Sequence, residues 1–263
     1  MKRNKVLAGI SLLMVLAGSA AAPRAWPAHP LVTDDTGTQG RRGLQLELVG
    51  ENSVDWGDED GVQVHEEATA AAATVSFGVA DSVDAVMSVP LLWLGRREDG
   101  VRVSQAKGLS DLALEMKWRF YEKKGLSLAL KPGLTLPTGS RTQGLGAGLP
   151  TYRAFAIASG EAGPLALHLN AGFVRNLNMD GDRANLWHFS VAPTVEVRPR
   201  LRLVANYGID RNPDRSADVD PMYLLGGFIF AVTEHVDVDF GVKAGLNKAV
   251  ADRSYLAGMA IRL

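Results

Sequence analysis

Two residues in the sequence have the types and the spacing of an activated nucleophile. His188 and Ser190 lie two residues apart, and Asn170 falls in the neighbouring predicted strand. A serine hydroxyl becomes nucleophilic when a histidine removes its proton, and a third polar group holds that histidine in orientation. The sequence therefore contains the side chains of a hydrolase, provided that the fold brings them together on an accessible face.

Acidic and glycine-rich loops raise the question of bound ions. Asp180-Gly181-Asp182, and farther along Asp214, Asp218 and Asp220, offer the carboxylate oxygens that hard cations prefer, but without the spacing of a calcium loop. The stretch Gly144-Leu145-Gly146 is not followed by a helical pattern, as a phosphate-binding loop would be. We therefore interpret all of these as solvated loops and expect neither a metal nor a cofactor.

Composition narrows the classes of protein further. The 263 residues have a net charge of -1 and no cysteine, which excludes a disulfide framework, thiol chemistry and a basic surface for nucleic acid. The chain starts with basic residues, continues with an apolar run from Val6 to Leu16, and then has small residues. This order is typical of a signal peptide, so we expect residues 1–21 to be one, cleaved after Ala20 or Ala21. It is not expected to be a membrane anchor, because the apolar run is shorter than the roughly 20 residues of a spanning helix.

The elements that position the chemical groups are predicted to be β-strands. Between Asp111 and Phe120 every even-numbered residue is large and apolar, whereas the odd-numbered residues are charged or small. Because successive side chains of a strand point to opposite faces, this stretch has one apolar and one charged face. The pattern recurs about twelve times over residues 43–263, in strands of the roughly ten residues that a tilted membrane-spanning strand needs.

The connections between these strands carry independent information. Long polar connections, such as Leu94 to Gly108 and Thr138 to Pro150, alternate with tight turns such as Glu122 to Gly125. This asymmetry predicts an up-and-down antiparallel transmembrane β-barrel with both termini on the periplasmic side. Residues 22–42 are expected to be an irregular periplasmic lead-in. Alternation is too weak at 151–159 and 222–232 to predict which side chains face inward.

Alternation alone does not say which face of a barrel is apolar, since a soluble ligand-binding barrel has the same pattern with an apolar interior. Mixed charges on the polar face, aromatic residues at strand ends and a strand count above eight together favour the membrane barrel. The predicted aromatic residues at the two membrane interfaces are Trp93, Trp118, Phe120, Phe173, Trp187, Tyr223 and Tyr255.

The polar face then lines the lumen. Its predicted residues are Glu47, Asp84, Asp111, Glu115, Lys117, Arg119, Lys131, His168, His188, Arg202, Asp237, Asp239 and Lys243. They either set the selectivity of a permeation path or brace one another inside a closed barrel, and the sequence leaves both interpretations open.

With the strands placed, several segments resemble the family of outer-membrane proteins linked to the MetA pathway of phenol degradation. The resemblance rests on His29–Gly40, Lys117–Tyr121, Leu128–Gly133, Leu136–Gly139, Leu186–His188, Asp210–Asp214 and Tyr223–Gly227. It implies a transporter, with aromatic or hydrophobic compounds as solutes. Barrels of this kind commonly end in Phe or Trp, which the assembly machinery reads, whereas this chain ends in Leu263.

The expected function is passage of small molecules through the outer membrane of a Gram-negative bacterium, reached by secretion through the periplasm. The alternative is a structural or surface-interaction barrel with a plugged lumen. An outer-membrane lipid hydrolase is remote, because His188 and Ser190 share the lumen face and point away from lipid. Expected partners are outer-membrane lipid and lipopolysaccharide, the barrel-assembly machinery and an unidentified solute, with no nucleic acid.

Overall fold

The structure, a computed structural model, describes residues 29–263, so the predicted signal peptide and residues 22–28 lie outside the described part. Its elements are the strands β1 (Leu44–Glu59), β2 (Val62–Ala80), β3 (Val83–Glu98), β4 (Val101–Leu109), β5 (Leu112–Lys123), β6 (Leu126–Leu136), β7 (Thr151–Ala162), β8 (Leu165–Asn176), β9 (Asn185–Arg198), β10 (Leu201–Asp210), β11 (Met222–Ala231), β12 (Val236–Gly245) and β13 (Arg253–Arg262), and the 3-10 helix η1 (Arg141–Gln143). No helix in this range is long and apolar enough to cross a membrane.

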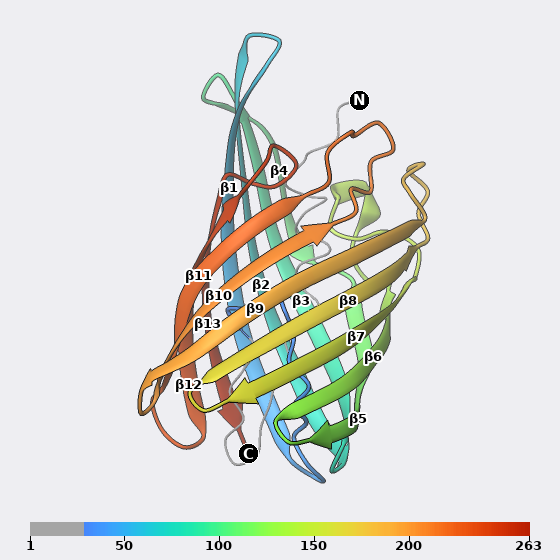
Figure 1. Cartoon of the computed structure of the whole chain (residues 1–263). Helices are drawn as coiled ribbons and strands as arrows, with labels where there is room; N and C mark the ends of the chain where they lie inside the picture. Colours follow the sequence, from blue (N-terminus) through green and yellow to red (C-terminus); the bar gives the residue numbers. More distant parts are fainter. Residues whose placement is uncertain (1–28) are drawn as a thin grey trace.

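The strands form one closed antiparallel wall. Except for β4 and β5, which do not pair with each other, each strand pairs with its neighbours in the chain, and β1 pairs with β13 from Gln45 opposite Arg262 to Val54 opposite Arg253. β4 and β5 occupy a single place in this wall, because both pair with the same side of β3. The result is the predicted twelve-strand up-and-down barrel (Figure 1).

The break between β4 and β5 is a bulge in the wall. Ser88 pairs with Ala113 and Leu91 pairs with Leu109, so two residues of β3 lie opposite three on the other side. One of the two is Pro90, which has no N–H to donate to a ladder and accepts a bond from Ser110 N at 2.9 Å. The extra residue on the β4–β5 side therefore lies where Pro90 already leaves the ladder without one N–H donor.

The predicted fifteen-residue loop from Leu94 to Gly108 is wrong. β3 and β4 continue as a hairpin through this stretch, and only Asp99 and Gly100 form the turn. Both turn residues have a positive φ, of 48° and 80°, as a two-residue hairpin turn requires. Together with the β1–β2 hairpin, this hairpin projects beyond the rest of the wall at the top of Figure 1.

The two faces of the wall have the predicted character. Along β5, Leu114 and Met116 are exposed on the outside, whereas Glu115 and Lys117 are buried inside. An apolar exterior and a charged interior are what a barrel surrounded by lipid needs. Of the predicted interfacial aromatic residues, those exposed on the outer face are Trp118, Phe120, Phe173 and Tyr255, and those half-buried are Trp93 and Trp187.

Tyr223 is the exception, and its predicted position at the membrane interface is wrong. It is 1% exposed and points inward from β11, as do Leu225 and Ile229. On β7, Phe155 and Ile157 also point inward. Alternation is weak in these two strands because their inner faces are apolar as well, so the lumen has one apolar side.

Candidate functional site

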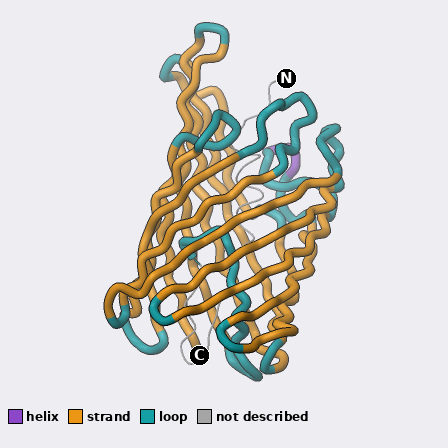
Figure 2. The backbone as a smooth tube through the Cα atoms, in the orientation of Figure 1, coloured by secondary structure: helices purple, strands orange, loops and turns teal. Residues whose placement is uncertain are grey.

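The lumen contains part of the chain itself, residues 29–42, which we call the lumen segment. It precedes β1 and runs through the interior of the barrel as an irregular loop (Figure 2). The prediction of an irregular stretch is confirmed for these residues, but the predicted periplasmic location is wrong. The amino-acid composition of this segment predicts that it has no regular structure, but it does not distinguish the periplasm from the interior of a barrel.

Side chains of the wall satisfy the backbone of the lumen segment. Asn206 Oδ1 on β10 accepts bonds from Val32 N and Thr33 N, at 2.7 and 2.9 Å. Asn170 Oδ1 on β8 accepts a bond from Asp34 N at 2.8 Å. A buried N–H without an acceptor is costly, so these two asparagines take the place that a neighbouring strand would have in a sheet.

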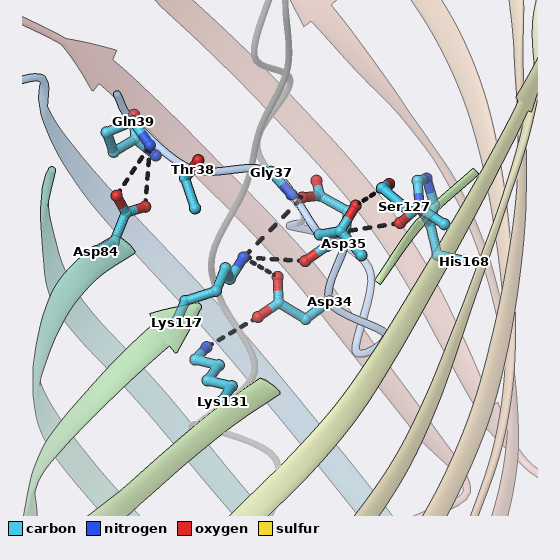
Figure 3. Close-up of polar contacts among 12 residues, drawn as sticks. Asp34, Asp35, Gly37, Thr38, Gln39, Asp84, Lys117, Ser127, Lys131 and His168 are labelled. Atoms are coloured by element: carbon cyan, nitrogen blue, oxygen red, sulfur yellow. Dashed lines mark hydrogen bonds and ion pairs between the residues drawn. The ribbon is translucent and has the colours of Figure 1, made fainter. Parts of the chain in front are cut away.

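The strongest anchor of the segment is Asp34. Its two carboxylate oxygens bind Lys117 Nζ of β5 at 2.8 Å and Lys131 Nζ of β6 at 2.9 Å, and all three side chains are almost completely buried (Figure 3). Lys131 also lies 3.4 Å from Glu115, which binds Arg153 Nε at 3.0 Å. Charges of alternating sign thus form one continuous network, as buried charges require.

The neighbouring Asp35 is bound mainly within the segment. Its Oδ1 accepts a bond from Gly37 N at 2.6 Å and lies 4.0 Å from Lys117 Nζ. Burial raises the pKa of the Asp35 carboxyl above its usual value; Lys117 opposes this shift, whereas Asp34 adds to it. The two adjacent acids therefore differ in role, since Asp34 binds the wall and Asp35 shapes the loop.

Further contacts fix both ends of the segment. Toward the end of the barrel with the short turns, Thr36 N donates to Ser159 Oγ at 3.1 Å, and Gln39 N donates to the Asp84 carboxylate at 3.0 Å (Figure 3 shows Gln39 and Asp84). At the start of the segment, His29 Nδ1 lies 2.5 Å from Asp239 Oδ1 of β12. The segment is thus attached to the wall along its whole described length.

Apolar residues of the segment meet the apolar side of the lumen. Leu31 packs in a buried cluster with Leu225 and Ile229, among others. Val32 belongs to a second cluster with Phe155 and Tyr223. The inward-facing apolar residues of β7 and β11, which the sequence pattern did not resolve, are therefore the surface on which the segment lies.

A loop at the end of the barrel away from the short turns also enters the interior. Leu145 from the loop after β6 is 2% exposed and packs against Leu92 and Leu94. Asp111 holds this loop by accepting bonds from Gly139 N at 2.9 Å and Ala147 N at 2.8 Å. This loop, interpreted from the sequence as solvated, is therefore anchored to the wall, and the carboxylate of Asp111, predicted as a lumen charge, binds the loop backbone.

The remaining predicted lumen residues form small local groups. Lys243 binds Glu51 at 2.6 Å, Asp237 pairs with Arg262, and Arg119 lies 3.3 Å from Glu122 near a short turn. His168 Nδ1 lies 2.9 Å from Ser159 Oγ. Glu47 is buried and Arg202 half-buried on the inner face. Sequence reasoning identified the wall charges and missed Asp34, because nothing in a loop-like stretch marks its location.

The candidate nucleophile is assembled with a different third member. His188 Nε2 lies 2.8 Å from Ser190 Oγ, and His188 Nδ1 lies 2.7 Å from Asp210 Oδ1. The predicted third group, Asn170, is wrong because its amide binds the backbone of Asp34. Asp210 is the last residue of β10 and lies directly opposite His188 in the sheet.

The acidic loops show ordinary protein contacts. Asp180 pairs with Arg141 at 2.7 Å, and Asp220 pairs with Arg211 at 2.9 Å. In the part of the chain that the structure describes, no group of three or more His, Cys, Asp or Glu side chains is placed to hold a metal ion.

A closed antiparallel barrel with an apolar outside, a charged inside, short turns at one end and longer hairpins and loops at the other is an outer-membrane β-barrel. Within this class, the chain belongs to the family described as "Putative MetA-pathway of phenol degradation", which matches residues 34–263. The matched region begins at Asp34 and so includes most of the lumen segment.

Solved structures with the same fold share little sequence with this chain. An outer membrane channel from Pseudomonas putida F1 is 12% identical with a TM-score of 0.68, over 87% of this chain and 98% of that one. The translocator domain of autotransporter NalP from Neisseria meningitidis is 10% identical with a TM-score of 0.56, over 84% and 88%. The CymD monoaromatic hydrocarbon channel is 11% identical with a TM-score of 0.50, over 98% and 97%. The search of curated proteins found no match.

Proposed function

We propose that this outer-membrane barrel is a channel for small molecules and that the lumen segment is its gate. The observation that carries the proposal is the attachment of Asp34 to Lys117 and Lys131. The segment is held by side-chain contacts and not by a β-ladder, so it can leave the wall without breaking the barrel. Water and a passing solute can then hydrate or pair the two lysines.

Aromatic or hydrophobic compounds are the proposed solutes. Phe155, Tyr223 and Leu225 give the lumen an apolar side, which supports weak binding of such molecules along the path. The family description, and the monoaromatic hydrocarbon named for one similar channel, favour the same solutes. The buried charges on the other side of the lumen, Lys117 and Lys131 among them, would set selectivity between cations and anions.

The route to the membrane belongs to the same proposal. Residues 1–21 would direct secretion and be removed, after which the barrel-assembly machinery would insert the strands among outer-membrane lipid and lipopolysaccharide. The long loops would then face the outside of the cell, with both ends of the barrel sequence toward the periplasm. Transport, and not catalysis, is the proposed main activity.

Conductance and solute flux test the proposal. The purified barrel is placed in planar bilayers and in liposomes, with and without aromatic acids, beside a variant that lacks residues 29–41. We expect a low conductance for the complete chain and a higher conductance and flux for the shortened one. The absence of conductance in both, with the barrel folded by heat-modifiable gel mobility, would favour the alternative of a structural or surface-interaction barrel, which the filled lumen also supports.

A further inference from the structure

Three side chains on the inner wall have the arrangement of a nucleophilic triad: Asp210, His188 and Ser190. The carboxylate binds one ring nitrogen at 2.7 Å, and the serine hydroxyl binds the other at 2.8 Å. We propose that Ser190 is an activated nucleophile that reacts with small esters entering the lumen. His188 acts as its base, and Asp210 positions His188.

The wall holds these residues in place. His188 and Ser190 alternate with outward residues of β9, and in β10 Asp210 lies opposite His188 and Gly208 lies opposite Ser190. All three triad residues are buried, so each has few alternative rotamers. Positions on paired strands give a more rigid geometry than positions on loops, which favours an ordered proton transfer.

A hydroxyl without a hydrogen-bond partner among the described residues lies over Gly208, the residue opposite Ser190. Tyr223 of β11 is opposite Gly208, and its side chain is buried with no hydrogen bond to the hydroxyl among the described residues. A Cβ at position 208 would overlap this hydroxyl, so glycine is what allows the Tyr223 hydroxyl to lie across β10 toward Ser190. A preorganised donor at this place would stabilise the oxyanion that forms when Ser190 attacks an ester.

The other side of the triad is apolar. Phe155 contacts His188 edge-on, with ring centroids 5.8 Å apart, and fills the space above Gly172, which is opposite His188. Val32 of the lumen segment packs in the same cluster as Phe155 and Tyr223. A small acyl or aryl group would take the place of Val32, so access to Ser190 requires the segment to move. Phospholipid is not the substrate class, because the triad faces the lumen.

The proposed reaction is acyl transfer to serine and then to water. Ser190 Oγ forms a bond to the acyl carbon while its proton passes to His188 Nε2. The bond from the acyl carbon to the leaving oxygen breaks, and that oxygen takes the proton and leaves as an alcohol or a phenol. Water then attacks the acyl-serine and gives one proton to His188. As the bond between the acyl carbon and Ser190 Oγ breaks, His188 passes this proton to Ser190 Oγ and the acid is released, which restores both residues.

The chain contains its own matched control. Ser159 also binds a histidine, with its Oγ 2.9 Å from His168 Nδ1. Within the described residues His168 has no carboxylate hydrogen-bonded to its second ring nitrogen, so this pair has a serine and a base but no positioning acid. If the triad activates Ser190, the two serines differ in reactivity; if a neighbouring histidine alone is enough, they do not.

Diisopropyl fluorophosphate is a small probe of this difference. Attack by Ser190 forms a bond between oxygen and phosphorus and releases fluoride, and the adduct is located by mass spectrometry of the folded, detergent-solubilised barrel. The variant Asp34→Asn, which loosens the lumen segment, is treated in parallel with the wild-type chain. We expect an adduct at Ser190 and none at Ser159, with faster labelling in Asp34→Asn.

Variants assign the roles. Ser190→Ala should lose the adduct, and His188→Gln should slow labelling by about 10²-fold or more, the contribution of a general base. Asp210→Asn should slow it strongly, whereas Asp210→Glu, which keeps a carboxylate, should recover part of the rate. Hydrolysis of 4-nitrophenyl acetate should follow the same order. The same loss in Asp210→Glu as in Asp210→Asn would overturn the positioning role.

The absence of an adduct at Ser190 in both the wild-type chain and Asp34→Asn, in barrels shown to be folded by gel mobility, would overturn the proposal. Equal labelling of Ser159 and Ser190 would overturn it too. Both results leave the conductance measurements unaffected, so a failure of this proposal is distinguishable from a failure of the channel proposal.

Discussion

Replacing Asp34 with asparagine tests whether the lumen segment is a movable gate or a fixed part of the barrel interior. The substitution removes the counter-ion that Lys117 and Lys131 share inside the barrel, at 2.8 and 2.9 Å. Removing one partner of a buried ion pair costs about 3 to 5 kcal/mol. The lower end applies, because Lys131 keeps Glu115 at 3.4 Å and Lys117 keeps the backbone oxygen of Asp35 at 3.1 Å.

This cost destabilises the state in which the lumen segment is bound to the wall, which we call the seated state. The unseated state, in which the segment has left the wall, is not affected in this way, because water can then hydrate both lysines and the segment. About 3 kcal/mol corresponds to a shift of roughly 10²-fold toward the unseated state, at tenfold for each 1.4 kcal/mol. We therefore expect a higher open probability in planar bilayers for Asp34→Asn than for the wild-type chain.

A chemical reporter measures the same shift without a membrane potential. The chain has no cysteine, so Thr33→Cys places a single thiol at a fully buried position of the segment. We expect maleimide to label this thiol roughly 10²-fold faster when Asp34→Asn is added, in line with the shift in population. Asp35→Asn is the matched control; it removes the adjacent charge, whose carboxylate is bound mainly to Gly37, and should change the rate less than about tenfold. Equal labelling rates and equal conductance in the two variants would refute the gate.

The remaining predictions concern the wall. Leu130→Arg puts a charge on the lipid face near the middle of β6 and should lower the free energy of unfolding by about 2 to 4 kcal/mol in vesicles, whereas Leu136→Arg, at the end of the same strand, should cost only about 0 to 1 kcal/mol; similar costs would contradict the depth of these residues. An epitope inserted between Asp99 and Gly100 should bind antibody on intact cells, and one between Lys124 and Gly125 should not; the reverse would mean an inverted barrel. Gly208→Ala should destabilise the barrel by about 1 to 3 kcal/mol in urea unfolding, because its methyl group overlaps the Tyr223 hydroxyl, and Gly160→Ala, with open space around its Cβ, is the control.

The sequence predicts the wall well where the two faces of a strand differ. β5 alternates without interruption, so the inward Glu115 and Lys117 could be identified from the pattern alone. β7 and β11 could not be resolved, because Phe155 and Tyr223 make their inner faces apolar too. The misplacement of Tyr223 has this cause, since an aromatic residue near a strand end is typical of a membrane interface.

The contents of the lumen could not be predicted from periodicity. A segment rich in threonine, aspartate and glycine has the same composition in solvent and in a polar interior, where wall residues such as Asn206 replace water as hydrogen-bond partners. The partners of Asp34 are 83 and 97 residues away in the chain. Similarly, Asp210 could not be assigned to His188 before the register of β9 and β10 was known.

The position of the lumen segment directly before β1 constrains the order in which the barrel assembles. β1 completes the ring by pairing with β13, the last strand of the described chain, and the contact between His29 and Asp239 spans 210 residues. Contacts between residues so far apart in the chain form late. The chain loses conformational entropy when the loop closes, before the contact itself contributes favourable free energy. A wall that closes before Asp34 reaches Lys117 and Lys131 encloses two ammonium groups that lack this shared counter-ion. Closing the barrel therefore has an electrostatic cost until the lumen segment, the first part of the described chain, brings Asp34 to the two lysines.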